Sequence, residues 1–130
     1  MVTDELTDGE RIARLLSSEV HGHERGALGR LSVVDAAASV EPTEAGAFAY
    51  AVEADDGGRI AEVYAHPDRS HVEFREGVRT AADAGHREGL RVRPKAVEPP
   101  RTLVFVENGA DVKPVLRVVR AVGEALDEPG

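Results

Sequence analysis

The sequence predicts an α+β fold in two layers, with an antiparallel sheet of about five to six strands and helices packed on one face. Its 130 residues suit a single domain, 1–130, with one hydrophobic core. Apolar residues recur with helical spacing near both ends of the chain, whereas the segments between them alternate with the period of two that strands require. The predicted order of elements is therefore α–β(3–4)–α–β2–α.

The first helix is predicted to begin at Thr7, which has capping-box spacing to Glu10 and is positioned to accept a hydrogen bond from the Glu10 amide. One apolar stripe follows with helical spacing, formed by Ile12, Leu15, Leu16 and Val20. Gly22 is expected to end the helix, because glycine commonly stops helices.

Strands with period two are predicted after this helix. They cover residues 31–34, 47–54, 59–66 and 70–75. Asp55-Asp56-Gly57-Gly58 and Pro67-Asp68 have the residue types of tight turns, so these strands should form an antiparallel meander.

The C-terminal half is predicted to hold a helix, two strands and a final helix. Their ranges are 76–88, 90–93, 101–107 and 112–126. Gly89 should end the first of these helices, Asn108-Gly109 should turn the chain, and Asp111 should cap the last helix. That last helix has apolar residues over about half its circumference, which indicates a helix that faces the core.

The composition is strongly acidic. The chain has 24 Asp and Glu against 16 Lys and Arg, a net charge of −8, and only two of the basic residues are lysines, Lys95 and Lys113. With a core of valine and alanine, this surface resembles that of proteins from salt-in halophilic archaea, where a Debye length of about 3 Å screens repulsion between carboxylates. An acidic bias in a high-GC genome is the alternative. If the resemblance holds, the acidity is an adaptation to the solvent and indicates nothing about partners.

The order of elements resembles the two-layer fold of secretion-chaperone-like domains and of small bacterial domains of the YjbR type. The overall character is also similar to that of small uncharacterised acidic protein families of halophilic archaea. Neither resemblance assigns a site residue to this sequence.

Several classes of function are excluded or disfavoured by composition. The chain has no cysteine, so disulfides, thiolate nucleophiles and cysteine-bound zinc are excluded. The acidic N-terminal residues do not resemble a signal peptide, and no apolar run is long enough to cross a membrane, so we expect a cytoplasmic protein. Only five aromatic residues are present, which argues against nucleic acid as a partner.

His21 and His23 are the first candidates for a metal site. Residues two apart on a helix point about 200° away from each other, so the pair cannot share a metal there. Cationic side chains and glycine are both favoured at helix C-termini, so we interpret this segment as the end of the first helix.

His66 and His71 flank the turn that contains Asp68 and Ser70. A catalytic triad is not expected, because its members must converge from distant parts of the chain. The two histidines could face each other across the end of a hairpin and bind a metal together with His86. Turn polarity explains the segment without a metal.

Basic residues concentrate between residues 75 and 101. This stretch has seven basic and four acidic residues, a net charge of +3, while the rest of the chain carries −11. Arg91 and Arg93 should project from one face of a strand, with Lys95 and Arg101 close by, and paired guanidinium groups bind carboxylates or phosphates well. Two alternatives follow: an internal ion-pair partner for acidic residues, or a binding site for an anion or an acidic protein surface.

The sequence alone does not define a function. The leading hypothesis is a non-catalytic binding or protein-interaction module that forms a homodimer, needs no cofactor, and binds through Arg91, Arg93, Lys95 and Arg101. One alternative is a metal-dependent enzyme or metal-binding protein that uses the histidines. The other is a domain that binds a small anionic ligand through the basic stretch.

Overall fold

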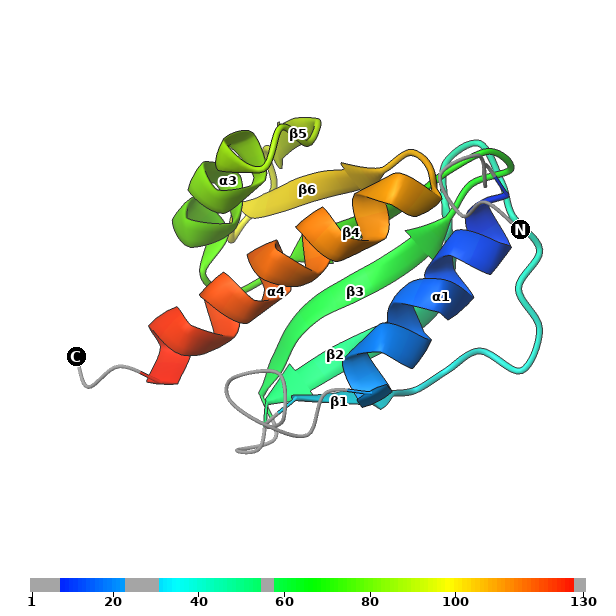
Figure 1. Ribbon diagram of the computed structural model, residues 1–130, viewed down its shortest axis with the longest axis horizontal. Helices are drawn as coiled ribbons and strands as arrows, with labels where there is room; N and C mark the ends of the chain where they lie inside the picture. The colour runs from blue at the N-terminus through cyan, green and yellow to red at the C-terminus, as the bar shows by residue number, and fades with distance from the viewer. Residues whose placement is uncertain (1–7, 23–30, 55–57, 128–130) are drawn as a thin grey trace.

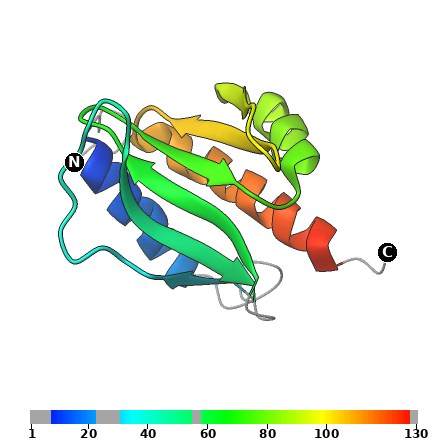
Figure 2. The same ribbon diagram turned by 180° about the vertical axis from the view of Figure 1, so that it is seen from behind.

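The computed structural model describes residues 8–22, 31–54 and 58–127, and it confirms the predicted α+β class. Within these ranges, three α-helices and a six-stranded sheet are present, and the helices lie across one face of the sheet (Figure 1). Figure 2, from behind, shows the strands with no helix in front of them. The elements are α1 (Gly9–Gly22), β1 (Leu31–Val34), β2 (Ala47–Ala54), β3 (Arg59–Ala65), β4 (Ser70–Phe74), α3 (Val78–Arg87), β5 (Val92–Lys95), β6 (Arg101–Val106), a 3₁₀ turn (Gly109–Asp111) and α4 (Val112–Asp127).

The sheet has the strand order β1-β2-β3-β4-β6-β5, and every neighbouring pair is antiparallel. The first four strands form the predicted meander. The chain then crosses the sheet through α3, returns as the edge strand β5 and enters the remaining position as β6. Three strands therefore lie on each side of the boundary between β3 and β4.

The side of the sheet beneath the helices forms the hydrophobic core. Its buried apolar residues make one cluster that includes side chains of all three helices and of the sheet. Phe74, Val104 and Val118 are fully buried in it. Because most members are valine or alanine, each contributes less buried apolar area than leucine or phenylalanine, and stability depends on many small contacts.

The N-terminal end of α1 is fastened to the turn between β3 and β4. The Ser70 hydroxyl donates a hydrogen bond to the Gly9 carbonyl oxygen at 2.6 Å. A Cβ atom at Gly9 would overlap the carbonyl oxygens of His66 and Arg69, so only glycine fits this approach. Further along the helix, the buried Tyr50 hydroxyl donates to the Ala13 carbonyl oxygen at 2.7 Å.

The helix caps differ from the sequence prediction. Asp8 caps α1, because its Oδ1 atom accepts a hydrogen bond from the Arg11 amide at 3.1 Å, and the predicted cap Thr7 lies outside the described residues. Before α4, the Asn108 side chain accepts from the Ala110 amide, and Asp111 turns back to accept from the Glu107 amide. The sequence assigned the capping to Asp111 alone, whereas in the structure Asn108 and Asp111 both accept backbone hydrogen bonds at the short 3₁₀ turn.

The strand predicted at 90–93 is displaced to Val92–Lys95. Leu90 is buried, and its amide donates to the Gly85 carbonyl oxygen, so this residue completes the end of α3 instead. Gly89, with a positive φ of 75°, ends that helix as predicted. The predicted turn at 55–57 lies outside the described residues.

Candidate functional site

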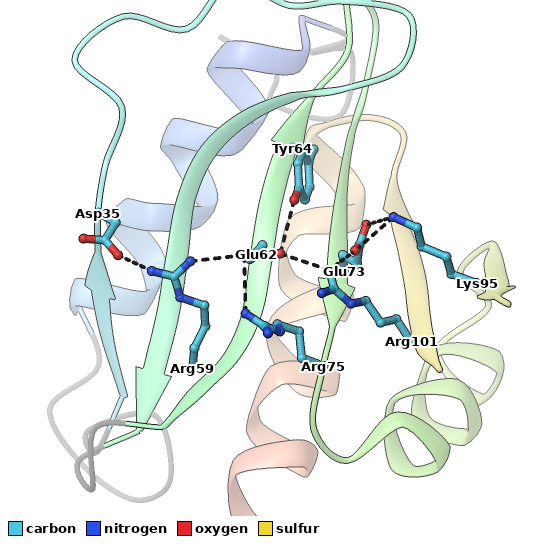
Figure 3. Close-up of polar contacts among 8 residues, drawn as sticks. All are labelled: Asp35, Arg59, Glu62, Tyr64, Glu73, Arg75, Lys95 and Arg101. Atoms are coloured by element: carbon cyan, nitrogen blue, oxygen red, sulfur yellow. Dashed lines mark hydrogen bonds and ion pairs between the residues drawn. The ribbon is translucent and has the colours of Figure 1, made fainter. Parts of the chain in front are cut away.

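The side of the sheet that the helices leave uncovered, here called the open face, carries the candidate site. Antiparallel sheets often expose one face to water, and polar residues are expected there. Figure 3 shows that the centre of this open face holds two glutamates surrounded by cations. Glu62 on β3 and Glu73 on β4 are direct cross-strand partners, and they are only 8% and 2% exposed. Two like charges opposite each other on neighbouring strands repel, so the pair requires cations.

Three arginines surround Glu62. Arg59, Arg75 and Arg101 each place an NH1 atom near its carboxylate, at 3.1, 3.7 and 3.3 Å respectively. The Tyr64 hydroxyl also donates a hydrogen bond to Glu62, at 3.2 Å. The carboxylate is thus an anchor that holds several guanidinium groups on the open face.

Glu73 is held by two cations, Arg101 from the neighbouring strand β6 and Lys95 from β5, one strand further away. Lys95 Nζ lies 3.3 and 3.2 Å from its two carboxylate oxygens, and Arg101 donates to the same carboxylate while also contacting Glu62. Burial by itself raises the pKa of Glu73, but the hydrogen bonds from Arg101 and Lys95 outweigh it and hold that pKa below its ordinary value of 4.5. Glu73 is therefore a carboxylate at neutral pH.

Charge is divided unequally across the open face. On the side of β4, β6 and β5, the cations Arg75, Arg93, Lys95 and Arg101 lie with the carboxylate Glu73, and the Arg91–Glu107 ion pair lies beside Phe105 on the same side; we call this the basic half. On the side of β1, β2 and β3, three carboxylates (Asp35, Glu53 and Glu62) accompany Arg59 among the described residues; we call this the acidic half. The open face therefore has a charge gradient across its strands.

A cluster of rings lies beside the glutamates, toward the turn between β3 and β4. The His71 ring stacks on Tyr64 with centroids 5.0 Å apart, and Phe105 lies 5.5 Å from the same histidine. His66 Nε2 and His71 Nδ1 are within hydrogen-bonding distance, at 2.8 Å. Burial has the largest effect on the pKa of His71 and, together with the charges of His66 and Lys95, lowers it from 6.5 to about 4, although Glu73 acts in the opposite direction.

The basic residues singled out by the sequence separate into two groups. Lys95 and Arg101 both contact Glu73, and Arg91 lies 3.6 Å from Glu107 with its guanidinium 4.9 Å from the centre of the Phe105 ring. These three have internal acidic partners. Arg93 is exposed and makes no ion pair or hydrogen bond with the residues that the structure describes.

Sequence reasoning missed the buried glutamates that organise the site. A signal was present, since Glu62 and Glu73 each stand among apolar residues in the centre of a strand, where an unpaired charge is costly. The partners could not be identified, because strand order and register bring Arg101 and Lys95 to Glu73 from distant parts of the chain.

The histidines proposed as metal ligands are only partly brought together. His66 and His71 are in contact, but His86 is exposed on α3, in the helical layer. His21 belongs to the last turn of α1, consistent with the predicted helix end, while its side chain and all of His23 lie outside the described residues. Within the described ranges, no group of three or more His, Asp or Glu side chains could hold a metal ion.

Comparison with known proteins adds a family but no activity. A family model described as "Family of unknown function (DUF7993)" matches residues 1–130. No curated protein and no solved structure matches the chain. No helix among the described residues is long and apolar enough to cross a membrane. Halophilic origin and a relation to YjbR-type domains stay predictions.

Proposed function

Since the chain belongs to the Family of unknown function (DUF7993), we infer its role from the site, and we propose a non-catalytic binding module that forms a homodimer through the open face. The observation that carries this proposal is the division of that face into a basic half and an acidic half. A second copy of the chain supplies a surface of complementary charge, as specific protein interfaces require.

The strand order determines how two copies would meet. A two-fold axis that runs along the strands between β3 and β4 places β5 of one copy over β1 of its twin. In this dimer, the basic half of each copy lies over the acidic half of the other copy. An axis running across the strands would instead place like charges together, so the charge gradient selects the first arrangement.

The open face offers ordered groups for such a contact. The buried carboxylates of Glu62 and Glu73 hold Arg59, Arg75 and Arg101 in place, so little side-chain entropy is left to lose on binding. Phe48 and Tyr64, which pack edge to face, are only partly buried and can contribute apolar area. The interface would thus combine fixed charges with an apolar contribution from these two rings, near the turn between β3 and β4.

The proposed dimer is expected to form in the salt-rich cytoplasm that the composition predicts. In molar salt the Debye length is about 3 Å, so charges separated by solvent contribute little to association. Direct ion pairs between Arg93 or Lys95 and the carboxylates of a twin remain effective, because the contacting groups exclude water and counterions.

Sedimentation velocity of charge-reversal variants tests the proposal. Arg93→Glu should weaken the association of wild-type dimers by at least about tenfold, because one attractive contact in each basic half becomes repulsive. Arg79→Glu is the matched control, since it makes the same charge change at an exposed position of α3. Circular dichroism should show both variants folded.

Either of two results would contradict the proposed dimer. The first is a wild-type chain that stays monomeric at millimolar concentration in both dilute and molar KCl. The second is equal weakening by the open-face and α3 variants, which would mean that net charge and not the open face governs association.

A small anionic ligand is the second candidate, because cations outnumber carboxylates in the basic half. Titration with inorganic phosphate separates this candidate from the dimer. Saturable binding that Arg93→Glu abolishes, in a chain that remains monomeric throughout, would favour the anion site.

A further inference from the structure

The hydrogen-bond partners of His66 determine where its proton lies. His66 Nδ1 is 2.9 Å from the Glu44 carbonyl oxygen, which can only accept, so Nδ1 must carry the hydrogen. In a neutral ring, Nε2 is then an acceptor. It faces His71 Nδ1 at 2.8 Å, and His71 must therefore donate from Nδ1. One carbonyl group thus sets the tautomer of both neutral rings.

This arrangement leaves His71 Nε2 without a hydrogen and without a hydrogen-bond partner. The His71 Nε2 atom is buried, and the carboxylate oxygen Oε1 of Glu73 lies 3.5 Å from it. A nitrogen lone pair then faces a carboxylate oxygen, and both atoms are acceptors. Because His71 is only 4% exposed, water has little access to donate hydrogen bonds to these two acceptors.

One added proton resolves the conflict in either of two ways. If His71 takes it, His71 becomes cationic and donates from Nε2 to Glu73. If His66 takes it, His66 donates from Nε2 to His71 Nδ1, and His71 moves its own hydrogen to Nε2. Both forms place a hydrogen between His71 Nε2 and Glu73.

We propose that uptake of one proton by the His66–His71 pair transfers Glu73 from Lys95 to His71 and releases the Lys95 ammonium to the dimer partner. Lys95 is the displaced cation because it is the more exposed of the two partners of Glu73, with 44% of its side chain accessible against 24% for Arg101. Association through the open face is then linked to protonation. This inference rests on the proposed dimer.

The charged and titratable surroundings of His71 support the direction of the linkage. They come from β3 (Tyr64 and Glu62), from the turn that follows it (His66), from β4 (Glu73), from β5 (Lys95) and from β6 (Arg101). Arg69 and Arg91 lie over the neighbouring Phe105 ring. Burial lowers the pKa of His71 most, and the Lys95 charge lowers it further. A partner carboxylate that draws Lys95 away therefore favours proton uptake, so acidification should strengthen the dimer.

Nitrogen NMR of the imidazole rings tests the proton positions directly. At neutral pH, both His66 and His71 should carry hydrogen on Nδ1, with His71 Nε2 bare. Acidification should place hydrogen on His71 Nε2 and should shift the Lys95 Nζ resonance at the same midpoint. Hydrogen on His71 Nε2 in the neutral pair would overturn the inference, whether or not the chain dimerises.

The dissociation constant of the dimer between pH 7.5 and 5 tests the linkage. We expect it to fall on acidification, by up to about tenfold per pH unit for each proton taken up. His71→Asn, which keeps an amide donor for His66 but has no titratable ring, should remove this dependence, as should Lys95→Met. His86→Gln, an exposed change on α3, should keep it.

The possible results separate the linkage from the dimer itself. A dimer whose dissociation constant is independent of pH, or varies equally in wild type and His71→Asn, overturns the linkage and leaves the dimer standing. A wild-type chain that is monomeric throughout overturns both.

Discussion

Acidification from pH 6.5 to 4.5 should lower the free energy of unfolding of the wild-type protein. Replacing His71 with asparagine should remove most of this pH dependence. Burial, followed by the charges of His66 and Lys95, lowers the pKa of His71 from 6.5 to about 4. A base whose pKa is lowered by folding stabilises the folded state fully above its unfolded pKa. That contribution is lost as the pH falls from about 6.5 toward the folded value.

The magnitude follows from the size of the shift. At about 1.4 kcal/mol for each pKa unit, the buried histidine contributes about 3 kcal/mol, and most of this should be gone at pH 4.5. Glu73 acts in a different range, because its pKa is lowered from 4.5 and its contribution is lost below that value. The two groups can therefore be separated by pH.

Urea denaturation at pH 7.5, 6.5, 5.5 and 4.5, in constant molar KCl, measures this effect. His71→Asn should be less stable than wild type at pH 7.5, because a ring packed between Tyr64 and Phe105 is lost. The difference should shrink by about 2 to 3 kcal/mol at pH 4.5. His86→Gln is the control and should follow wild type. Parallel pH profiles for wild type and His71→Asn would refute the assignment of a buried neutral imidazole.

Three further changes test other parts of the structure. Gly9→Ala should destabilise the fold by about 3 kcal/mol or more in thermal denaturation, because its Cβ would overlap the His66 carbonyl oxygen; an unchanged midpoint would contradict the docking of α1. Tyr50→Phe should cost about 1 kcal/mol, since the buried hydrogen bond to the Ala13 carbonyl oxygen is lost, and equal stability would contradict that bond. Transfer from molar KCl to dilute buffer should lower the thermal midpoint of a chain with a net charge of −8, and an unchanged midpoint would count against the halophile interpretation.

Local sequence patterns were sufficient for most of the fold. The stripe that includes Ile12 and Leu16, the alternation around Phe74 and the stop at Gly89 reflect interactions within a few residues, so they identify elements correctly. The displaced strand is an instructive exception. Leu90 fits a strand by local pattern, but its contacts with the end of α3 exclude it.

The candidate site depended on information that is absent from local patterns. The sequence identified Lys95 and Arg101 as parts of a basic stretch, yet their common partner Glu73 lies 22 and 28 residues away. The contact arises because β6 is inserted between β4 and β5. Periodicity predicts which residues form strands, but it contains little about the order in which the strands pair.

Thiol cross-linking between mixed single-cysteine variants tests the open-face dimer most directly, because the natural chain has no cysteine. Ser32→Cys lies on the edge strand β1, and Arg93→Cys lies on the opposite edge strand β5, both at exposed positions. With a short bismaleimide in molar KCl, the mixture should yield a cross-linked pair of one Ser32→Cys and one Arg93→Cys chain. A mixture of Ser32→Cys with Arg79→Cys, on α3, should yield none. Failure of the first mixture to cross-link, or equal cross-linking in both, would contradict a dimer in which the basic half of one open face meets the acidic half of the other.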